Sequence, residues 1–116
     1  TIPYNFVAGS EGTPSYDERL AALDEAFKQA WLASCPDFQI KHGYPKRAPG
    51  QANLKMATAW VGNQFRCLAF TVEMPFKDNA GRPNPLTGWN GARSKALGAS
   101  LLAPMWAVVG SLRSGV

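Results

Sequence analysis

The sequence predicts an α/β fold, a partial mixed sheet with helices on its faces. Three segments repeat apolar residues at helical spacing, and two short segments between them have the alternating or continuously apolar pattern of strands. The chain of 116 residues is long enough for one domain with its own core. Its apolar content of 46% and charged content of 17% are typical of a globular protein.

The first helix is expected to run from about residue 15 to about Ser34. Ser15 can cap its start, with Glu18 completing a capping box, and Thr13 followed by Pro14 is an equally good start. The apolar residues that follow have helical spacing and give the helix one apolar face: Leu20, Leu23, Phe27, Ala30 and Trp31.

A strand and a turn-rich loop are expected next. "FQIKH", residues 38–42, alternates as a strand does, and "GYPKRAPGQ" after it is rich in turn residues. Three side chains of this loop could ring a pocket: Tyr44, Lys46 and Arg47.

A second helix is expected from about Asn53, followed by a strand over Cys67–Val72. The strand is short and continuously apolar, which is typical of a central strand covered on both faces. The loop of residues 75–91 is long for a compact domain, and such loops are functional or disordered. The last segment predicts a long apolar helix that Pro104 kinks or divides.

Two strands are too few for an independent sheet. Because the sequence also starts at Thr1 and not at Met, we expect it to be a piece of a longer chain whose further strands lie upstream. No run of eighteen apolar residues is present, so no membrane-spanning helix is expected.

The net charge of +4 is unevenly distributed. Up to Asp37 six acidic residues face two basic ones, whereas beyond it ten basic residues face two acidic ones. This asymmetry would suit an acidic ligand, a nucleic acid or an absent acidic partner. The basic residues are scattered and lack interleaved aromatic residues, so solvated surface charge is the favoured interpretation and nucleic acid is not expected as a partner.

The two cysteines, Cys35 and Cys67, are expected to be reduced thiols of a cytoplasmic protein. A Cys–His couple with His42, the sole histidine, is conceivable, but no signature supports it.

Glu73 is the most informative residue, because it closes an apolar strand and immediately precedes the long loop. Ligands of open α/β sheets bind at the carboxyl ends of strands. A carboxylate between apolar walls has its charged form disfavoured, which suits a general base or acid. The alternative is that Glu73 only marks where the strand reaches water.

Three stretches, "PYNFVAGSEGTPSYDERLAAL", "LAFTVEMPFKDN" and "GWNGARSKALGASLL", resemble the C-terminal part of M14-family zinc carboxypeptidases, closest to the bacterial branch related to cytosolic carboxypeptidases. The resemblance covers essentially the whole chain and implies the C-terminal portion of such a catalytic domain. Glu73 in "FTVE" matches the family's general-base glutamate. It would deprotonate a zinc-bound water and pass the proton to the departing amine.

The family's His-x-x-Glu zinc pair and its third histidine are absent from the sequence, as is the asparagine–arginine pair that binds the substrate's terminal carboxylate. This chain alone is therefore expected neither to bind catalytic zinc nor to hydrolyse peptides. Zinc would belong to the full-length parent, with a peptide C-terminus as its substrate.

The resemblance also implies three substrate-binding residues. Tyr44 is the candidate for the family's tyrosine that closes over the substrate, and a solvent-facing turn tyrosine is the alternative. Lys55, and with it Arg47, could pair with an acidic side chain in the specificity pocket. Lys55 at a helix start is otherwise a solvated cation.

Two functions from different classes follow. The first is a fragment of a zinc metallocarboxypeptidase, which would associate with the missing N-terminal half of its domain or with itself. The alternative is a non-catalytic basic α/β module that binds an anionic partner.

Overall fold

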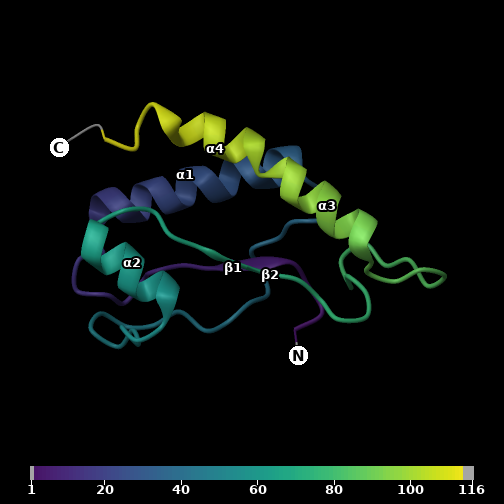
Figure 1. Ribbon diagram of the computed structural model, residues 1–116, viewed down its shortest axis with the longest axis horizontal. Helices are drawn as coiled ribbons and strands as arrows, with labels where there is room; N and C mark the ends of the chain where they lie inside the picture. Colours follow the sequence, from purple (N-terminus) through teal and green to yellow (C-terminus); the bar gives the residue numbers. More distant parts are fainter. Residues whose placement is uncertain (1, 114–116) are drawn as a thin grey trace.

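The computed structural model describes residues 2–113. Its elements are, in chain order, β1 (Phe6–Ala8), α1 (Glu18–Ser34), α2 (Ala57–Phe65), β2 (Thr71–Glu73), α3 (Gly91–Ser100) and α4 (Leu102–Val109). β1 and β2 form a two-stranded antiparallel sheet, and α1 and α4 lie next to each other along one side of it (Figure 1). The predicted α/β class, with helices packed on a partial sheet, is confirmed.

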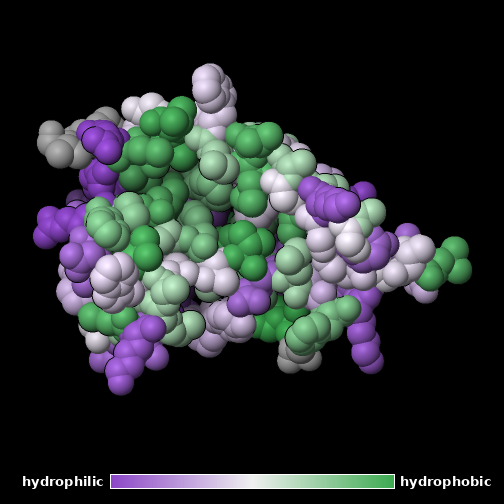
Figure 2. All heavy atoms as spheres, in the orientation of Figure 1, coloured by the Kyte–Doolittle hydropathy of each residue, from purple (hydrophilic) through white to green (hydrophobic). Residues whose placement is uncertain are grey.

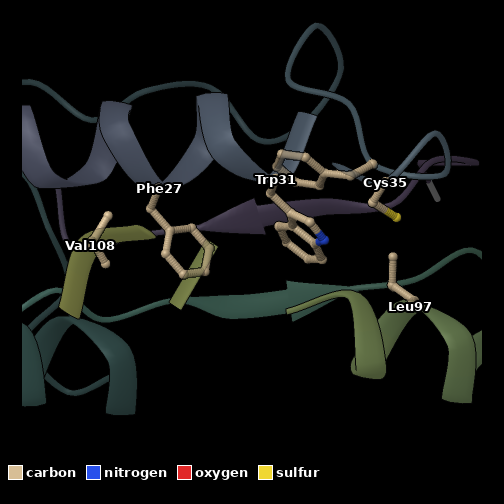
Figure 3. Close-up of a cluster of buried hydrophobic side chains, with 6 residues drawn as sticks. Phe27, Trp31, Cys35, Leu97 and Val108 are labelled. Atoms are coloured by element: carbon tan, nitrogen blue, oxygen red, sulfur yellow. The ribbon is translucent and has the colours of Figure 1, made fainter. Parts of the chain in front are cut away.

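The core lies between the sheet and the helices α1, α3 and α4. Phe27, Trp31 and Cys35 extend from α1 and its end toward the sheet, and Leu97 and Val108 approach from α3 and α4 (Figure 3). Trp31 is fully buried, and its Nε1 donates a hydrogen bond of 2.7 Å to Ser100 Oγ. The expected apolar face of the first helix is therefore the face that builds the core.

The pairing of β1 with β2 decides which side chains share a face of the sheet. Val7 is opposite Val72, and both pack against the core cluster. Phe6 is opposite Glu73. Because side chains alternate along a strand, Phe6 and Glu73 together occupy the face turned away from the core.

The first helix ends at Ser34 as expected, but its predicted caps are wrong. Asp17 is the N-cap, and its carboxylate accepts a hydrogen bond from the Leu20 amide at 2.9 Å. Ser15 instead binds Asn63 at the end of α2, through its amide and its hydroxyl. The serine is thus used for a long-range contact, and the next capping residue starts the helix.

The predicted strand over residues 38–42 is also wrong. Only Phe38 pairs, in an isolated parallel bridge with Asn5. The Gln39 side chain donates to the backbone oxygens of Asn5 and His42 and accepts from the His42 amide. The two bonds with His42 fold the segment into a turn, which competes with an extended strand, and the bond to Asn5 joins this turn to the segment before β1.

The second helix starts later than predicted. Asn53 does not cap it, because its side chain accepts from the Lys55 amide and closes a turn over the next residues. The helix begins at Ala57.

The second strand is displaced relative to its prediction, from Cys67–Val72 to Thr71–Glu73. It is not covered on both faces, since Thr71 is exposed and the other two residues are half-buried. Its length matches that of β1, the strand with which it pairs.

The C-terminal apolar segment is divided, as Pro104 predicts. α3 ends at Ser100 and α4 begins at Leu102, with Pro104 buried in the first turn of α4. Proline has no amide hydrogen, so the carbonyl of Ser100 loses its helical donor there. No helix within residues 2–113 has the length and apolar character needed to cross a membrane.

Candidate active site

Glu73 stands at the last position of β2, where the chain leaves the sheet for the loop of residues 74–90 (Figure 1). It is half-buried, on the face of the sheet that the core does not use. Pro75, two residues after Glu73, is buried, and the chain leaves the sheet there. The expected carboxylate at a strand end is therefore present in the structure, and its role in proton transfer stays a prediction.

Tyr44 lies on the same face as Glu73. Its ring meets the ring of Phe6 edge-on, with 4.9 Å between the ring centroids and 85° between the ring planes. Phe6 is the cross-strand neighbour of Glu73, so Tyr44 and Glu73 flank one buried ring. Phe6 and Tyr44 also line a cavity of about 380 Å³, together with Glu11, Lys28 and residues 39–46. Tyr44 itself is 55% exposed.

The two candidate specificity residues lie beside the start of α2. Lys55 is exposed two residues before the helix, and Arg47 is half-buried with its Nη2 at 3.8 Å from Met56 Sδ. Thr58 in the first turn of α2 hydrogen-bonds Thr71, which is two residues before Glu73 and on the same face. The start of α2 therefore adjoins the face that carries Glu73. No described contact joins either cation to Glu73 or Tyr44.

A group of five polar side chains links the ends of both strands to the helices. We call Asn5, Asp37, Asp78, Asn79 and Arg93 the Asp37 cluster. Arg93 Nη1 donates to Asp78 Oδ1 at 3.1 Å, and its Nη2 lies 3.4 Å from Asp37 Oδ1. Asn79 Nδ2 donates to Asp37 Oδ1 and to its backbone oxygen, both at 3.4 Å, and Asn5 Nδ2 donates to the same backbone oxygen at 3.0 Å.

Sequence reasoning missed the Asp37 cluster. Its members come from the segment before β1, the segment after α1, the loop after β2 and the first turn of α3. Asp37 and Arg93 are 56 positions apart, and no local pattern connects residues at that separation. A pairing of isolated acids and arginines is not visible without the fold.

One further titratable side chain, Tyr16, lies outside the groups of residues described so far. Tyr16 donates to Asp24 Oδ2 at 3.3 Å; burial raises the pKa of Tyr16 above its usual value, and the Asp24 and Glu11 carboxylates add to this rise. Tyr16 therefore remains a neutral donor to Asp24, which is itself buried and paired with Lys28 at 2.6 Å.

The described residues do not fit a metal centre. Across residues 2–113, no three His, Cys, Asp or Glu side chains come together in a group that could hold a metal ion. His42 is exposed and stacks on Tyr4 with 4.0 Å between ring centroids. Cys35 is buried in the core, Cys67 is half-buried, and both are free thiols, as predicted.

Comparison with solved structures finds close relatives. The metallo-carboxypeptidase of Pseudomonas aeruginosa, solved with (2-guanidinoethylmercapto)succinic acid, is 52% identical, with a TM-score of 0.93 over 97% of this chain and 30% of that one. The metallo-carboxypeptidase of Burkholderia cenocepacia is 48% identical, with a TM-score of 0.86 over 94% of this chain and 29% of that one.

Among curated proteins, an uncharacterised protein of Zymomonas mobilis is 40% identical over 102 residues, which are 88% of this chain and 27% of that protein. No family model matches the chain. The chain is related to the M14 metallo-carboxypeptidases over almost its whole length. It spans less than a third of the length of each of these relatives.

Proposed function

We propose that the chain is the C-terminal part of the catalytic domain of a cytoplasmic bacterial zinc metallocarboxypeptidase, in which Glu73 is the general base. The full-length protein would hydrolyse the C-terminal peptide bond of its substrate. The relation to metallo-carboxypeptidases supports the class of reaction. The position of Glu73 supports its role.

One observation carries this assignment of Glu73. The antiparallel pairing places its side chain beside Phe6, at the strand end and on the face where Tyr44 packs. Ligands of open α/β sheets bind beyond the carboxyl ends of strands, so a carboxylate at this point is within reach of a bound substrate. A half-buried carboxylate is also partly shielded from water, as a proton-transfer group needs to be.

In the proposed reaction the Glu73 carboxylate takes a proton from the attacking water and then delivers it to the departing amine. Tyr44 would close over the bound peptide from the loop beside Phe6. Zinc, when bound, would polarise the scissile carbonyl. Because residues 2–113 contain no metal-binding group, the zinc ligands would lie in another part of the full-length protein, and the isolated chain would be inactive.

Lys55 and Arg47 are proposed to favour a substrate with an acidic C-terminal residue. Both are cations near the start of α2, which adjoins the Glu73 face through Thr58 and Thr71. An arginine or lysine that pairs with the substrate's side-chain carboxylate would add a charge-assisted hydrogen bond to binding.

The test is a peptidase assay of the full-length protein that identifies the end of the peptide from which residues are released. Peptides with free ends that differ only in their last residue are incubated with the protein, and the released amino acid is identified by mass spectrometry. We expect release of single C-terminal residues, faster for glutamate or aspartate than for leucine, and loss of release when a chelator removes the metal. Amino-terminal release, internal cleavage, or no cleavage by metal-loaded protein would contradict the proposed function.

The alternative, a basic module that binds an anionic partner, has less support. Arg82 and Arg93, which border a cavity of about 450 Å³, are paired with Asp37 and Asp78. Their charge is therefore largely compensated within the chain, so this cavity offers little uncompensated charge to a polyanion.

We further propose that the rest of the catalytic domain covers apolar surface that this chain exposes. α4 exposes a stripe of four large apolar side chains at helical spacing: Leu102, Met105, Trp106 and Val109. Figure 2 shows apolar surface along the upper part of the molecule, where α4 lies in Figure 1. Leu102 is 70% and Trp106 80% exposed. The outer edge of each strand is also unpaired within residues 2–113. Exposed apolar stripes and free strand edges both promote association.

The isolated chain is therefore expected to self-associate in sedimentation velocity runs at micromolar concentration. Trp106→Lys should weaken this association, because it places a charge at the centre of the stripe. Lys95→Gln, on the exposed side of α3, is the matched surface control and should leave the association unchanged. A chain that stays a monodisperse monomer at micromolar concentration would contradict the proposal.

A further inference from the structure

The position of the Glu73 carboxylate depends on the chain that flanks it. β2 has three residues, and within residues 2–113 it is paired on one side only, with β1. Immediately after Glu73 the chain enters the loop of residues 74–90. The end of so short a strand frays unless its flanks are fixed, because few backbone hydrogen bonds hold it.

Asp37 is bonded to both flanks of the Phe6–Glu73 pair. On one side, Asn5 directly precedes Phe6 and donates through Nδ2 to the Asp37 backbone oxygen. On the other side, Asn79, six residues after Glu73, donates to the same oxygen and to the Asp37 carboxylate. Asn5 is 0% and Asn79 1% exposed, so water does not compete for these bonds.

Arg93 connects this arrangement to α3. Its guanidinium bridges the carboxylates of Asp37 and Asp78 and donates to the Arg82 backbone oxygen at 2.8 Å. It also stacks on the Trp89 ring, at 4.7 Å from its centroid. The Trp89 amide donates to the Lys77 backbone oxygen at 2.8 Å, which closes the loop at its base. The loop after Glu73 is therefore held from both of its ends.

The charges of the Asp37 cluster indicate that it holds the segments around the Phe6–Glu73 pair and is not a binding site for an anion. Arg93 faces two carboxylates, and Arg82 Nη1 lies 3.1 Å from Asp37 Oδ1. The side chains of Asp37 and Arg93 are each more than four-fifths buried. With every guanidinium in this group already paired, an incoming phosphate or carboxylate would have to displace an ion pair.

We propose that Asp37 and Arg93 are positioning residues, which hold the Glu73 carboxylate in place by fixing the segments before Phe6 and after Glu73. The catalytic consequence of this inference rests on the proposed function. Its structural part, the fixing of β2, does not. A displacement of about 1 Å at a reacting group lowers the rate by up to about 100-fold.

The test uses Asp37→Ala in the full-length protein, with Asp37→Asn as the conservative variant that keeps one acceptor oxygen. Asp37→Ala is expected to lower kcat about 10- to 100-fold, with KM within about threefold and metal content unchanged. Asp37→Asn should recover part of the loss. Glu25→Gln is the matched control, since Glu25 is an exposed acid of α1 whose side chain bonds only Gln29 among the described contacts. It should leave kcat unchanged.

A double-mutant comparison separates positioning from a general loss of stability. If Asp37 acts through Glu73, Asp37→Ala combined with Glu73→Gln should be no slower than Glu73→Gln alone. A further loss in the double variant, equal to that of Asp37→Ala in the wild-type background, would overturn the inference.

Hydrogen exchange provides a readout that does not need activity. Amides of the peptide that spans β2 should exchange at least about 10-fold faster in Asp37→Ala than in wild type or Glu25→Gln. Unchanged exchange there would overturn the inference whatever the activity. Faster exchange in a protein without peptidase activity would support the fixing of β2 by Asp37 and refute the proposed function instead.

Discussion

Glu73→Gln is expected to lower the kcat of the full-length protein by about 10²- to 10⁴-fold, the usual contribution of general acid–base catalysis. The amide has the size of the carboxylate, so the Phe6–Glu73 pairing and the packing of Tyr44 on Phe6 should persist. It cannot take up a proton, however, and therefore neither activates the water nor protonates the departing amine.

Glu73→Asp is the informative companion variant. It keeps the carboxylate but withdraws it by one methylene from the end of β2. Its kcat should fall between those of wild type and Glu73→Gln, because proton transfer requires the base within hydrogen-bonding reach. Equal rates for Glu73→Gln and Glu73→Asp would indicate that the site needs the shape of Glu73 and not its basicity.

Trp31→Ala is expected to lower the free energy of unfolding by about 3–5 kcal/mol, the typical cost of removing a buried tryptophan. Trp31 is 0% exposed, and its ring stacks on Phe38 with 4.0 Å between centroids. Its indole nitrogen donates to Ser100, so the change also breaks the contact between α1 and the end of α3. Urea unfolding of the chain, at a concentration below that at which sedimentation velocity detects self-association, measures the effect.

Trp106→Ala provides the matched control, since it removes the same side chain from a position that is 80% exposed. Its free energy of unfolding should stay within about 0.5 kcal/mol of wild type, as is usual for surface substitutions. Similar losses for both variants would contradict the placement of the core between α1, α3 and the sheet.

The parts of the fold that could be predicted are those specified by local chemistry. The apolar spacing from Leu20 to Trp31 specifies the buried face of α1 without reference to any other segment. The division of the C-terminal helix follows from the missing amide hydrogen of Pro104 alone.

The parts that could not be predicted depend on distant partners. Ser15 has the chemistry of a helix cap, but its contact with Asn63, 48 positions away, decides its use. The limits of β2 depend on β1, and the turn at residues 39–42 is held by Gln39, whose side chain also bonds the backbone of Asn5, 34 positions away. A local sequence pattern contains no information about such contacts. The predicted boundaries of these elements therefore differ from those in the structure.

The candidate site divides in the same way. Glu73 could be predicted because a carboxylate at the end of an apolar strand is a local feature and because the surrounding residues resemble a known family. The proximity of Tyr44 to the same face required the pairing of Phe6 with Glu73. The Asp37 cluster required the whole fold, since its bonds join residues 32 to 56 positions apart, except for those that Asp78 forms with Asn79 and Arg93.

The most direct test of the central claim, that the acid at the end of β2 moves the proton in peptide hydrolysis, is to determine kcat and bound metal together on one preparation of full-length Glu73→Gln. We expect turnover to be lost while the metal content equals that of wild type. A variant that retains both its metal and a near-normal kcat would contradict the claim.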